Sequence, residues 1–271
     1  MKKFKKVLSI LLCLVLMAGI LPVSALADGE DVAQIGKEKF STLSAAITKA
    51  GSDATIQLIS NVTENIKIEK SLTLDLNGFT LTGEGKDSVV TISGTDTVVT
   101  ITSTAKNDDD SIKNGIITGG IGSKENQNYF GGGIFIVEST VTLSNLTVRQ
   151  NSTDLENGPN TTGFSRTGGG GIASVKASLT LNNVTVSDNH VFDVSEGGGI
   201  FAIGGTLNIS NSTIRDNVAV DEGGGIFAEN SVVSIAHSVI TDNTAKYGGG
   251  IKIQNDPDVL KKTPTYGLGT T

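Results

Sequence analysis

Apolar and polar residues alternate along most of this chain, in short blocks that recur. Within a block the apolar positions are two residues apart, which is the period of a β-strand rather than a helix. Thr, Val and Ile dominate the blocks, as they do in strands. The pattern therefore predicts a chain of many short strands. Its less regular upstream blocks are residues 55–59, 66–68, 72–76, 89–92 and 98–101.

Five glycine runs punctuate the second half of the chain, and an isoleucine follows each of them. Self-similarity at a spacing of about 25 residues is typical of proteins built from stacked repeats. One such unit cannot bury its apolar face alone, whereas stacked units share a continuous core. The isoleucines that mark the repeats are Ile134, Ile172, Ile200, Ile226 and Ile251.

Two columns of turn residues recur at fixed distances after the first four of these isoleucines. A turn residue that recurs in every repeat lies over its own copies, and Asn can donate to and accept from neighbouring copies. We therefore expect a structural ladder, in which His237 substitutes for Asn. The first column is Asn145, Asn183, Asn211 and His237, and the second is Asn151, Asn189, Asn217 and Asn243.

Together these patterns predict an all-β fold, a parallel β-helix solenoid of about seven to eight coils over residues 54–255. Residues 41–50 have the spacing of a short helix that Ser41 caps and Gly51 ends. We expect this helix, within a lead-in of residues 28–53, to cover the N-terminal end of the core. Residues 256–271 read as a polar tail, which either folds over the other end or leads into a longer protein.

The first 27 residues have the composition of an export signal. Four lysines precede a nearly continuous apolar run, 7–21, and Ala25-Leu26-Ala27 matches the small-x-small cleavage pattern. A membrane anchor is the alternative, but about 15 apolar residues are fewer than the ~20 that a spanning helix needs. We predict cleavage before Asp28 and a secreted, extracellular or cell-surface location.

Cleavage would change the formal net charge from −7 to −11 and remove the only cysteine. An exported chain without cysteine depends on packing and hydrogen bonds instead of disulfides. Its acidic charge argues against nucleic acid as a partner. No second apolar stretch after residue 27 is long enough for a transmembrane helix.

With these residues in view, the chain resembles right-handed parallel β-helix proteins of bacterial cell surfaces, the pectate-lyase-like superfold. Residues 66–78, Ile-Lys-Ile-Glu-Lys-Ser-Leu-Thr-Leu-Asp-Leu-Asn-Gly, are similar to the opening coil of many secreted members. The Gly-Gly-Gly-Ile repeats are similar to the Gly-Gly-Ala-Ile repeats of polymorphic membrane protein adhesins, and their Phe-x-x-Asn motif occurs once, at Phe227 to Asn230. The resemblance covers about residues 35–255 and implies a right-handed coil. This superfold hosts lyases, hydrolases and adhesins, so it does not select one function.

Three aspartates offer the clearest candidate for chemistry. Asp188, Asp216 and Asp242 each precede an Asn of the second column, and stacked copies would lie about 4.8 Å apart. Such carboxylates could share a metal, and Ca²⁺ is the cofactor that they would suit. Asp is also a favoured turn residue, so repeat duplication alone explains the column equally. We identify no catalytic residue.

All variation in repeat length falls between the second Asn column and the next glycine run, so insertions project from one edge. Aromatic rings in these loops could stack on sugars or anchor a protein, or they could pack the loops against the strands. We expect a non-catalytic, adhesin-like or structural protein that binds a polysaccharide or an extracellular protein through this edge. The alternative is a carbohydrate-active enzyme, a polysaccharide lyase or glycoside hydrolase. The candidate ring residues are Tyr129, Phe130, Phe164, Phe192 and Tyr247.

Overall fold

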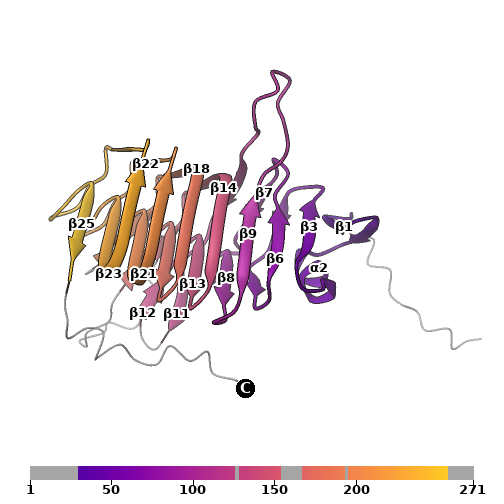
Figure 1. The fold of residues 1–271 in the computed structure, drawn as a ribbon, viewed down its shortest axis with the longest axis horizontal. Helices are drawn as coiled ribbons and strands as arrows, with labels where there is room; N and C mark the ends of the chain where they lie inside the picture. Colours follow the sequence, from indigo (N-terminus) through magenta and orange to yellow (C-terminus); the bar gives the residue numbers. More distant parts are fainter. Residues whose placement is uncertain (1–29, 126–127, 154–166, 193–194, 256–271) are drawn as a thin grey trace, which may run out of the picture. The chain divides into compact units, whose positions relative to one another are not determined.

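The structure is a computed structural model that describes residues 30–125, 128–153, 167–192 and 195–255. This part of the chain is mostly β with one short helix (Figure 1). Its strands and helix belong to one compact unit that begins at Asp31. The strands form a 19-stranded, a 4-stranded and a 2-stranded sheet. None of the described helical residues forms a segment that is long and apolar enough to span a membrane.

Apart from an N-terminal hairpin, the large sheet consists of three stacks of parallel strands, and the chain visits the stacks in turn. The first holds β3 (Ala54–Leu58), β6 (Leu72–Asp75), β9 (Val98–Thr102), the first parts of β14 (Thr140–Arg149) and β18 (Ser178–Ser187), and the second parts of β21 (Ile200–Ser210) and β23 (Ile226–Ala236). The second holds β4 (Val62–Thr63), β7 (Thr80–Thr82), β10 (Gly115–Thr118), the second parts of β14 and β18, β22 (Thr213–Arg215) and β24 (Val239–Thr241). The third holds β5 (Ile66–Ile68), β8 (Val90–Ser93), β13 (Ile134–Val137), β17 (Ile172–Val175), the first parts of β21 and β23, and β25 (Ile251–Gln254).

The five marker isoleucines lie side by side in the third stack. Ile134 pairs with Ile172, Ile172 with Ile200, Ile200 with Ile226, and Ile226 with Ile251. The register therefore holds although the loops between repeats differ in length. The expectation of many short strands is confirmed, and the less regular upstream blocks also form β3, β5, β6, β8 and β9.

Before the first stack the chain forms a hairpin and a helix. β1 (Ala33–Ile35) pairs antiparallel with β2 (Glu38–Phe40) and with β3. The helix α2 (Leu43–Lys49) begins later than the sequence predicted, because Thr42 and not Ser41 caps it: the Thr42 hydroxyl accepts a hydrogen bond from the Ala45 amide. Its apolar face joins the core through Leu43, Ala46 and Ile47.

Charged side chains hold both ends of α2. The Glu64 carboxylate accepts hydrogen bonds from the amides of Leu43 and Ser44 at 2.7 and 3.0 Å. The Lys70 ammonium donates to the carbonyl of Ala50 at 2.8 Å. An acid at the N-terminus and a base at the C-terminus both complement the helix dipole. The helix is therefore tied to the strands at each end.

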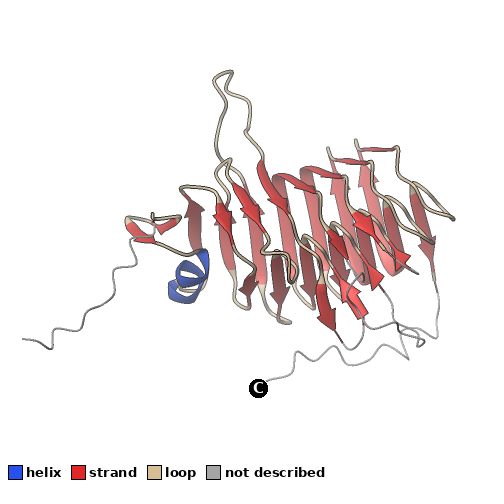
Figure 2. Cartoon of the chain, turned by 180° about the vertical axis from the view of Figure 1, so that it is seen from behind, coloured by secondary structure: helices blue, strands red, loops and turns tan. Residues whose placement is uncertain are grey.

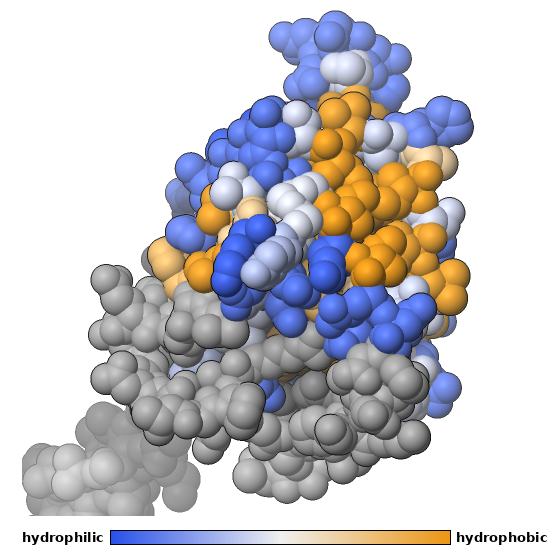
Figure 3. All heavy atoms as spheres, turned by 90° about the vertical axis from the view of Figure 1, so that its left-hand side faces the viewer, coloured by the Kyte–Doolittle hydropathy of each residue, from blue (hydrophilic) through white to orange (hydrophobic). Residues whose placement is uncertain are grey.

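The main apolar core is filled by inward-facing residues of the three stacks. At the last strands this core stays open, because Ile251 is 38% and Ile253 54% exposed. The view from the β25 side shows an apolar surface there (Figure 3).

Two small sheets lie outside the large one. β11 (Ser123–Glu125), β12 (Asn128–Phe130), β16 (Thr167–Gly168) and β20 (Ser195–Glu196) form the 4-stranded sheet, and β15 (Ser152–Thr153) pairs with β19 (His190–Val191). A separate loop between β9 and β10 projects away from the strands (Figure 2). This loop carries the acidic stretch that ends in Asp110, whose carboxylate accepts a hydrogen bond from Lys106.

Candidate functional site

The second Asn column forms a buried ladder. Asn151, Asn189 and Asn217 are at most 2% exposed. The side-chain nitrogen of each donates to the side-chain oxygen of the next, at 3.1, 2.9 and 2.9 Å, and Asn243 ends the series. Each of these oxygens also accepts from the backbone amide of the preceding Asn, as in the bond from Asn189 to Asn217 at 3.1 Å. These bonds tie neighbouring repeats together and satisfy polar groups that would otherwise be buried alone.

The first column has a different role. Asn145, Asn183, Asn211 and His237 all adopt left-handed φ angles, between 49° and 56°. Asn tolerates this conformation better than most residues because its short side chain bonds locally. Only part of the column is joined by side chains, since Asn183 donates to Asn145 at 2.9 Å whereas Asn211 donates to Asn182. The column therefore marks a turn on the surface.

The aspartate column lies in another left-handed turn. Asp188, Asp216 and Asp242 have φ values of 56°, 55° and 53°, and Gln150 occupies the same place in the preceding repeat with 54°. The Asp216 carboxylate accepts a hydrogen bond from the Arg215 guanidinium, and the Asp242 carboxylate accepts one from the Thr241 hydroxyl. Among the described residues no group of three His, Cys, Asp or Glu side chains is placed to hold a metal ion. Asp is favoured in such turns, so the turn geometry is one reason for this column.

The candidate aromatic residues differ in exposure. Phe164 lies outside the described residues. The Phe130 side chain is fully buried, as expected of a ring that packs its loop against the strands and not of a ligand contact. Three rings remain available: Tyr129, Phe192 and Tyr247.

Phe130 belongs to an outer apolar layer, defined as Phe130, Phe135, Val137, Ala173, Val175, Phe201, Ile203 and Phe227. Its ring stacks between Phe135 and Phe201, with ring centroids 5.6 and 5.5 Å away. Ala173 is the strand residue between Phe135 and Phe201, and its small side chain leaves room for the inserted ring. The 4-stranded sheet thus folds back over the outward face of the third stack.

The three remaining rings lie on the insertion edge, each beside a nitrogenous side chain. Tyr129 is half-buried, with the Lys124 ammonium 6.0 Å from its ring. Phe192 is 41% exposed, and the His190 ring lies 3.9 Å from it. Tyr247 is 53% exposed, with the Lys246 ammonium at 5.1 Å. Rings held beside cations, as Tyr129 and Tyr247 are, favour stacking on a sugar or a protein side chain.

Burial changes the acidity of His190, which lies on this edge. Burial lowers the pKa of His190 below its usual 6.5, because a partly desolvated imidazole disfavours the charged form. The imidazole beside Phe192 therefore favours its neutral form, and its plane is tilted by 34° from that of the Phe192 ring.

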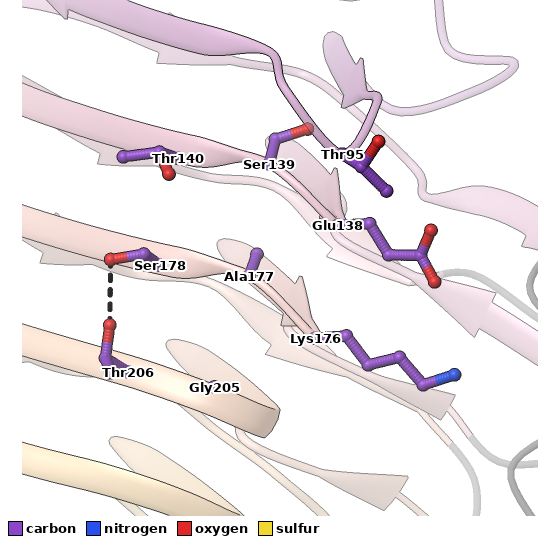
Figure 4. A pocket seen from close by; sticks show the side chains of 9 residues that line it. All are labelled: Thr95, Glu138, Ser139, Thr140, Lys176, Ala177, Ser178, Gly205 and Thr206. Carbon is purple, nitrogen blue, oxygen red and sulfur yellow. Dashed lines mark hydrogen bonds between the residues drawn. The ribbon is translucent and has the colours of Figure 1, made fainter.

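Sequence reasoning missed a second surface, which we call the corner groove. It is an open groove of about 290 Å³, lined by Thr95, Glu138, Ser139, Thr140, Lys176, Ala177, Ser178, Gly205 and Thr206. Glu138 and Lys176 extend in the same direction from adjacent turns, while the hydroxyls of Ser178 and Thr206 bond to each other at 2.8 Å on the other side (Figure 4). The groove therefore offers one acid, one base and a row of hydroxyls.

Turn geometry and small residues together create this groove. Glu138 and Lys176 have φ values of 51° and 52°, and Gly204 takes the same turn in the next repeat at 57°. The floor beside them is low because Ala177 and Gly205 carry little or no side chain, and a Cβ atom at Gly205 would collide with the Ala177 carbonyl. The residues at these turns differ in chemistry from repeat to repeat. Only the pair Gly204-Gly205 could have drawn attention to the corner.

The groove has too few carboxylates for the common mechanism of glycoside hydrolysis. Glycoside hydrolysis by the common mechanism needs two carboxyl groups about 5–9 Å apart, and Glu138 is the one carboxylate among the lining residues. The hydroxyls, the acid and the base are instead suited to hydrogen bonds with a polar ligand.

Comparison of the chain with models of known protein families, with characterised proteins and with solved structures finds no match.

Proposed function

We propose that residues 54–255 form a right-handed parallel β-helix. The three stacks support this, because the chain passes through them in the same order in every repeat and equivalent residues pair in register. Counting one strand from each stack as a coil agrees with about seven to eight coils. In this architecture α2 is the cap of the N-terminal end. The right hand rests on the resemblance and on the strong preference of parallel connections for that hand.

We infer that the protein is exported. The support is the basic and apolar pattern of residues 1–27, which lie outside the described residues. Expression of the full chain in a bacterium and mass analysis of the secreted product tests this inference. We expect a chain that starts at Asp28, and an intact N-terminus on a membrane-bound product would contradict it.

We propose that this exported β-helix binds a polysaccharide or an extracellular protein without catalysis, as an adhesin-like or surface protein. The exposed rings of the insertion edge carry the proposal: Phe192 and Tyr247 are 41% and 53% exposed although aromatic side chains usually gain from burial. They project from loops that the strand stacks hold in place. A rigid scaffold with aromatic residues on its loops is the arrangement that binding proteins commonly use.

Binding of the full chain to an array of bacterial and host glycans and matrix proteins tests this proposal. We expect the variant Phe192→Ala with Tyr247→Ala to bind at least about 10-fold more weakly to its best ligand. The matched control is Val98→Ala, because Val98 is 54% exposed in the first stack, away from the edge. Equal binding by both variants, or binding to no ligand, would refute the role of the edge.

The alternative of a carbohydrate-active enzyme is tested in the same buffers by screening for cleaved polysaccharide. Release of unsaturated or reducing ends would support the enzyme, and loss of that activity in Glu138→Gln would place it in the corner groove.

Calcium binding to the aspartate column is tested by comparing thermal melts in Ca²⁺ and in EDTA. A rise in Tm with Ca²⁺ that Asp216→Asn abolishes would establish the site.

A further inference from the structure

The corner groove lies where the third stack ends and the first stack begins. Rows of residues form it, one residue from each repeat, because the strands on both sides pair in register. The rows run across the strands, so the groove follows the direction in which the repeats stack. Its floor is Ser139, Ala177 and Gly205, its charged wall is Glu138 and Lys176, and its hydroxyl wall is Thr140, Ser178 and Thr206 (Figure 4).

The hydroxyl wall is complementary to a ligand that carries hydroxyls itself. Thr140 is exposed, and Ser178 and Thr206 are half-buried. The hydroxyls of Ser178 and Thr206 bond to each other at 2.8 Å. Because each hydroxyl has one proton and two lone pairs, this pair keeps a donor and several acceptor sites for a ligand. Sugar hydroxyls, which both donate and accept, fit such a wall.

The charged wall gives the groove one negative and one positive charge, and the other lining residues are uncharged. Glu138 and Lys176 are both half-buried and extend in the same direction. A carboxylate accepts and an ammonium donates several hydrogen bonds, so both groups can bond to the hydroxyls of a neutral ligand. A ligand with charges of one sign would be repelled by one of the two, and an acidic ligand also by the net charge of −7. Charge complementarity therefore favours an uncharged ligand.

The spacing of the repeats sets the length of the groove. Its lining residues come from successive levels of the stacks, which begin at Thr95, Glu138, Lys176 and Gly205. Three spacings of about 4.8 Å make a groove about 14 Å long, which is the length of a short oligosaccharide. Beyond Thr206 the hydroxyl wall continues with Val232, which is 70% exposed and can contact the apolar C–H face of a sugar ring. An extended polysaccharide along the stacking direction therefore meets similar groups at every level.

We propose that the corner groove is a second binding site, which holds an uncharged polysaccharide segment in extended form along the stacking direction. The site is separate from the insertion edge, because the loops of that edge precede the third-stack strands whereas the groove follows them, as Glu138 follows β13. Its hydroxyls and its pair of opposite charges carry the binding, and the exposed rings take no part in it. The groove therefore stands or falls independently of the insertion edge.

Calorimetric titration of the full chain with a cello-oligosaccharide, a chito-oligosaccharide and an oligogalacturonate of equal length tests the proposal. We expect an uncharged oligosaccharide to bind, and we expect Thr140→Val with Thr206→Val to weaken its binding about 10-fold, because two hydrogen-bonding groups are lost while the side-chain shape is kept. The matched control is Thr142→Val with Thr180→Val, since these threonines pair on the same strands but lie outside the groove. Binding of neither uncharged oligosaccharide, or equal binding by both double variants, would overturn the proposal.

Two further titrations separate this site from the insertion edge and test the preference for an uncharged ligand. Glu138→Gln keeps the length of the side chain but removes its charge, so we expect at least about 5-fold weaker binding of the same oligosaccharide. Loss of binding in Phe192→Ala with Tyr247→Ala, but not in the groove variants, would place the ligand on the insertion edge and overturn the proposal. Tighter binding of the oligogalacturonate than of both uncharged oligosaccharides would also overturn it.

Discussion

At the scale of single residues, the repeats are organised by left-handed turns as much as by strands. The exposed column, the aspartate column and the corner turns all have φ values near 50–57°. Asn and Asp are favoured at such turns because their side chains bond locally, so their recurrence is structural before it is chemical. The buried ladder differs, since its side chains form an unbroken series of hydrogen bonds from repeat to repeat.

We predict that Asn217→Ala destabilises the protein by about 2–4 kcal/mol. The change removes the acceptor for Asn189 and the donor to Asn243 and to the Val186 carbonyl. Chemical unfolding measures the loss. The control is Asn211→Gly in the exposed column, where glycine keeps the left-handed turn (φ 51°). An equal loss in both variants would show that the buried ladder contributes no more than a turn.

We predict that acid weakens the fold through His190. Burial lowers the pKa of His190 in the folded state below 6.5, so the unfolded chain binds the proton more tightly. The stability that depends on neutral His190 is complete above about pH 6.5 and declines as the pH falls below it.

Thermal melts at pH 7.5 and 5.0 measure this effect. Because His190 is only partly buried, we expect His190→Gln to reduce the acid-induced drop in Tm by about 1–2 °C. His237→Asn, which restores the residue of the other repeats, should leave the drop unchanged. A drop of the same size in all three proteins would exclude His190 as its source.

At the scale of elements, the third stack differs from the other two. Residues 134–137 read Ile-Phe-Ile-Val, an unbroken apolar run, and all four are buried. Continuous apolar runs are typical of strands that are covered on both faces. The inward residues join the main core, and the outward ones join the outer apolar layer. The small 4-stranded sheet contributes Phe130 to the cover of this outward face.

We predict that Phe130→Ala costs about 3–5 kcal/mol, because it empties the space between Phe135 and Phe201. Ala173→Phe alone should also destabilise, by about 1–3 kcal/mol, because two rings would compete for one space. The double variant should recover much of the loss, since a strand residue then completes the stack of rings. Additive losses in the double variant, measured by chemical unfolding, would refute the swap.

At the scale of the whole molecule, the proposed β-helix makes each repeat interchangeable with its neighbours. Ile200 and Ile226 occupy the same position in adjacent strands. Deletion of residues 200–225 joins Gly199 to Ile226 and removes one whole repeat without changing the register.

We predict that this deletion leaves a protein with a β-sheet circular dichroism spectrum and a cooperative melt, because stacked repeats contact only their neighbours. Deletion of residues 200–212 is the control, since it removes β21 and joins the glycine run that precedes a third-stack strand directly to β22 of the second stack. We expect that variant to aggregate. Aggregation of both variants would argue against interchangeable repeats.

The period-two pattern and the equal spacing of the Ile and Asn columns were enough to predict the strands and their parallel pairing, and side chains join the second Asn column throughout but the first only in part. These features can be predicted from the sequence because each position lies over its own copies in neighbouring repeats. The same residue pattern therefore recurs at a fixed spacing along the chain. The upstream strands could be predicted for the same reason, although their spacing is less regular.

Tertiary structure alone decided what the loops do, because their lengths and residues do not repeat. Phe130 looks like any exposed loop aromatic in the sequence, and only the return of β12 over Ala173 places it in the outer apolar layer. The corner groove likewise depends on Glu138 and Lys176 lining one groove from adjacent repeats, although they are far apart in the chain. A repeat specifies contacts with its own copies by periodicity, whereas contacts between unlike segments depend on the path of the folded chain.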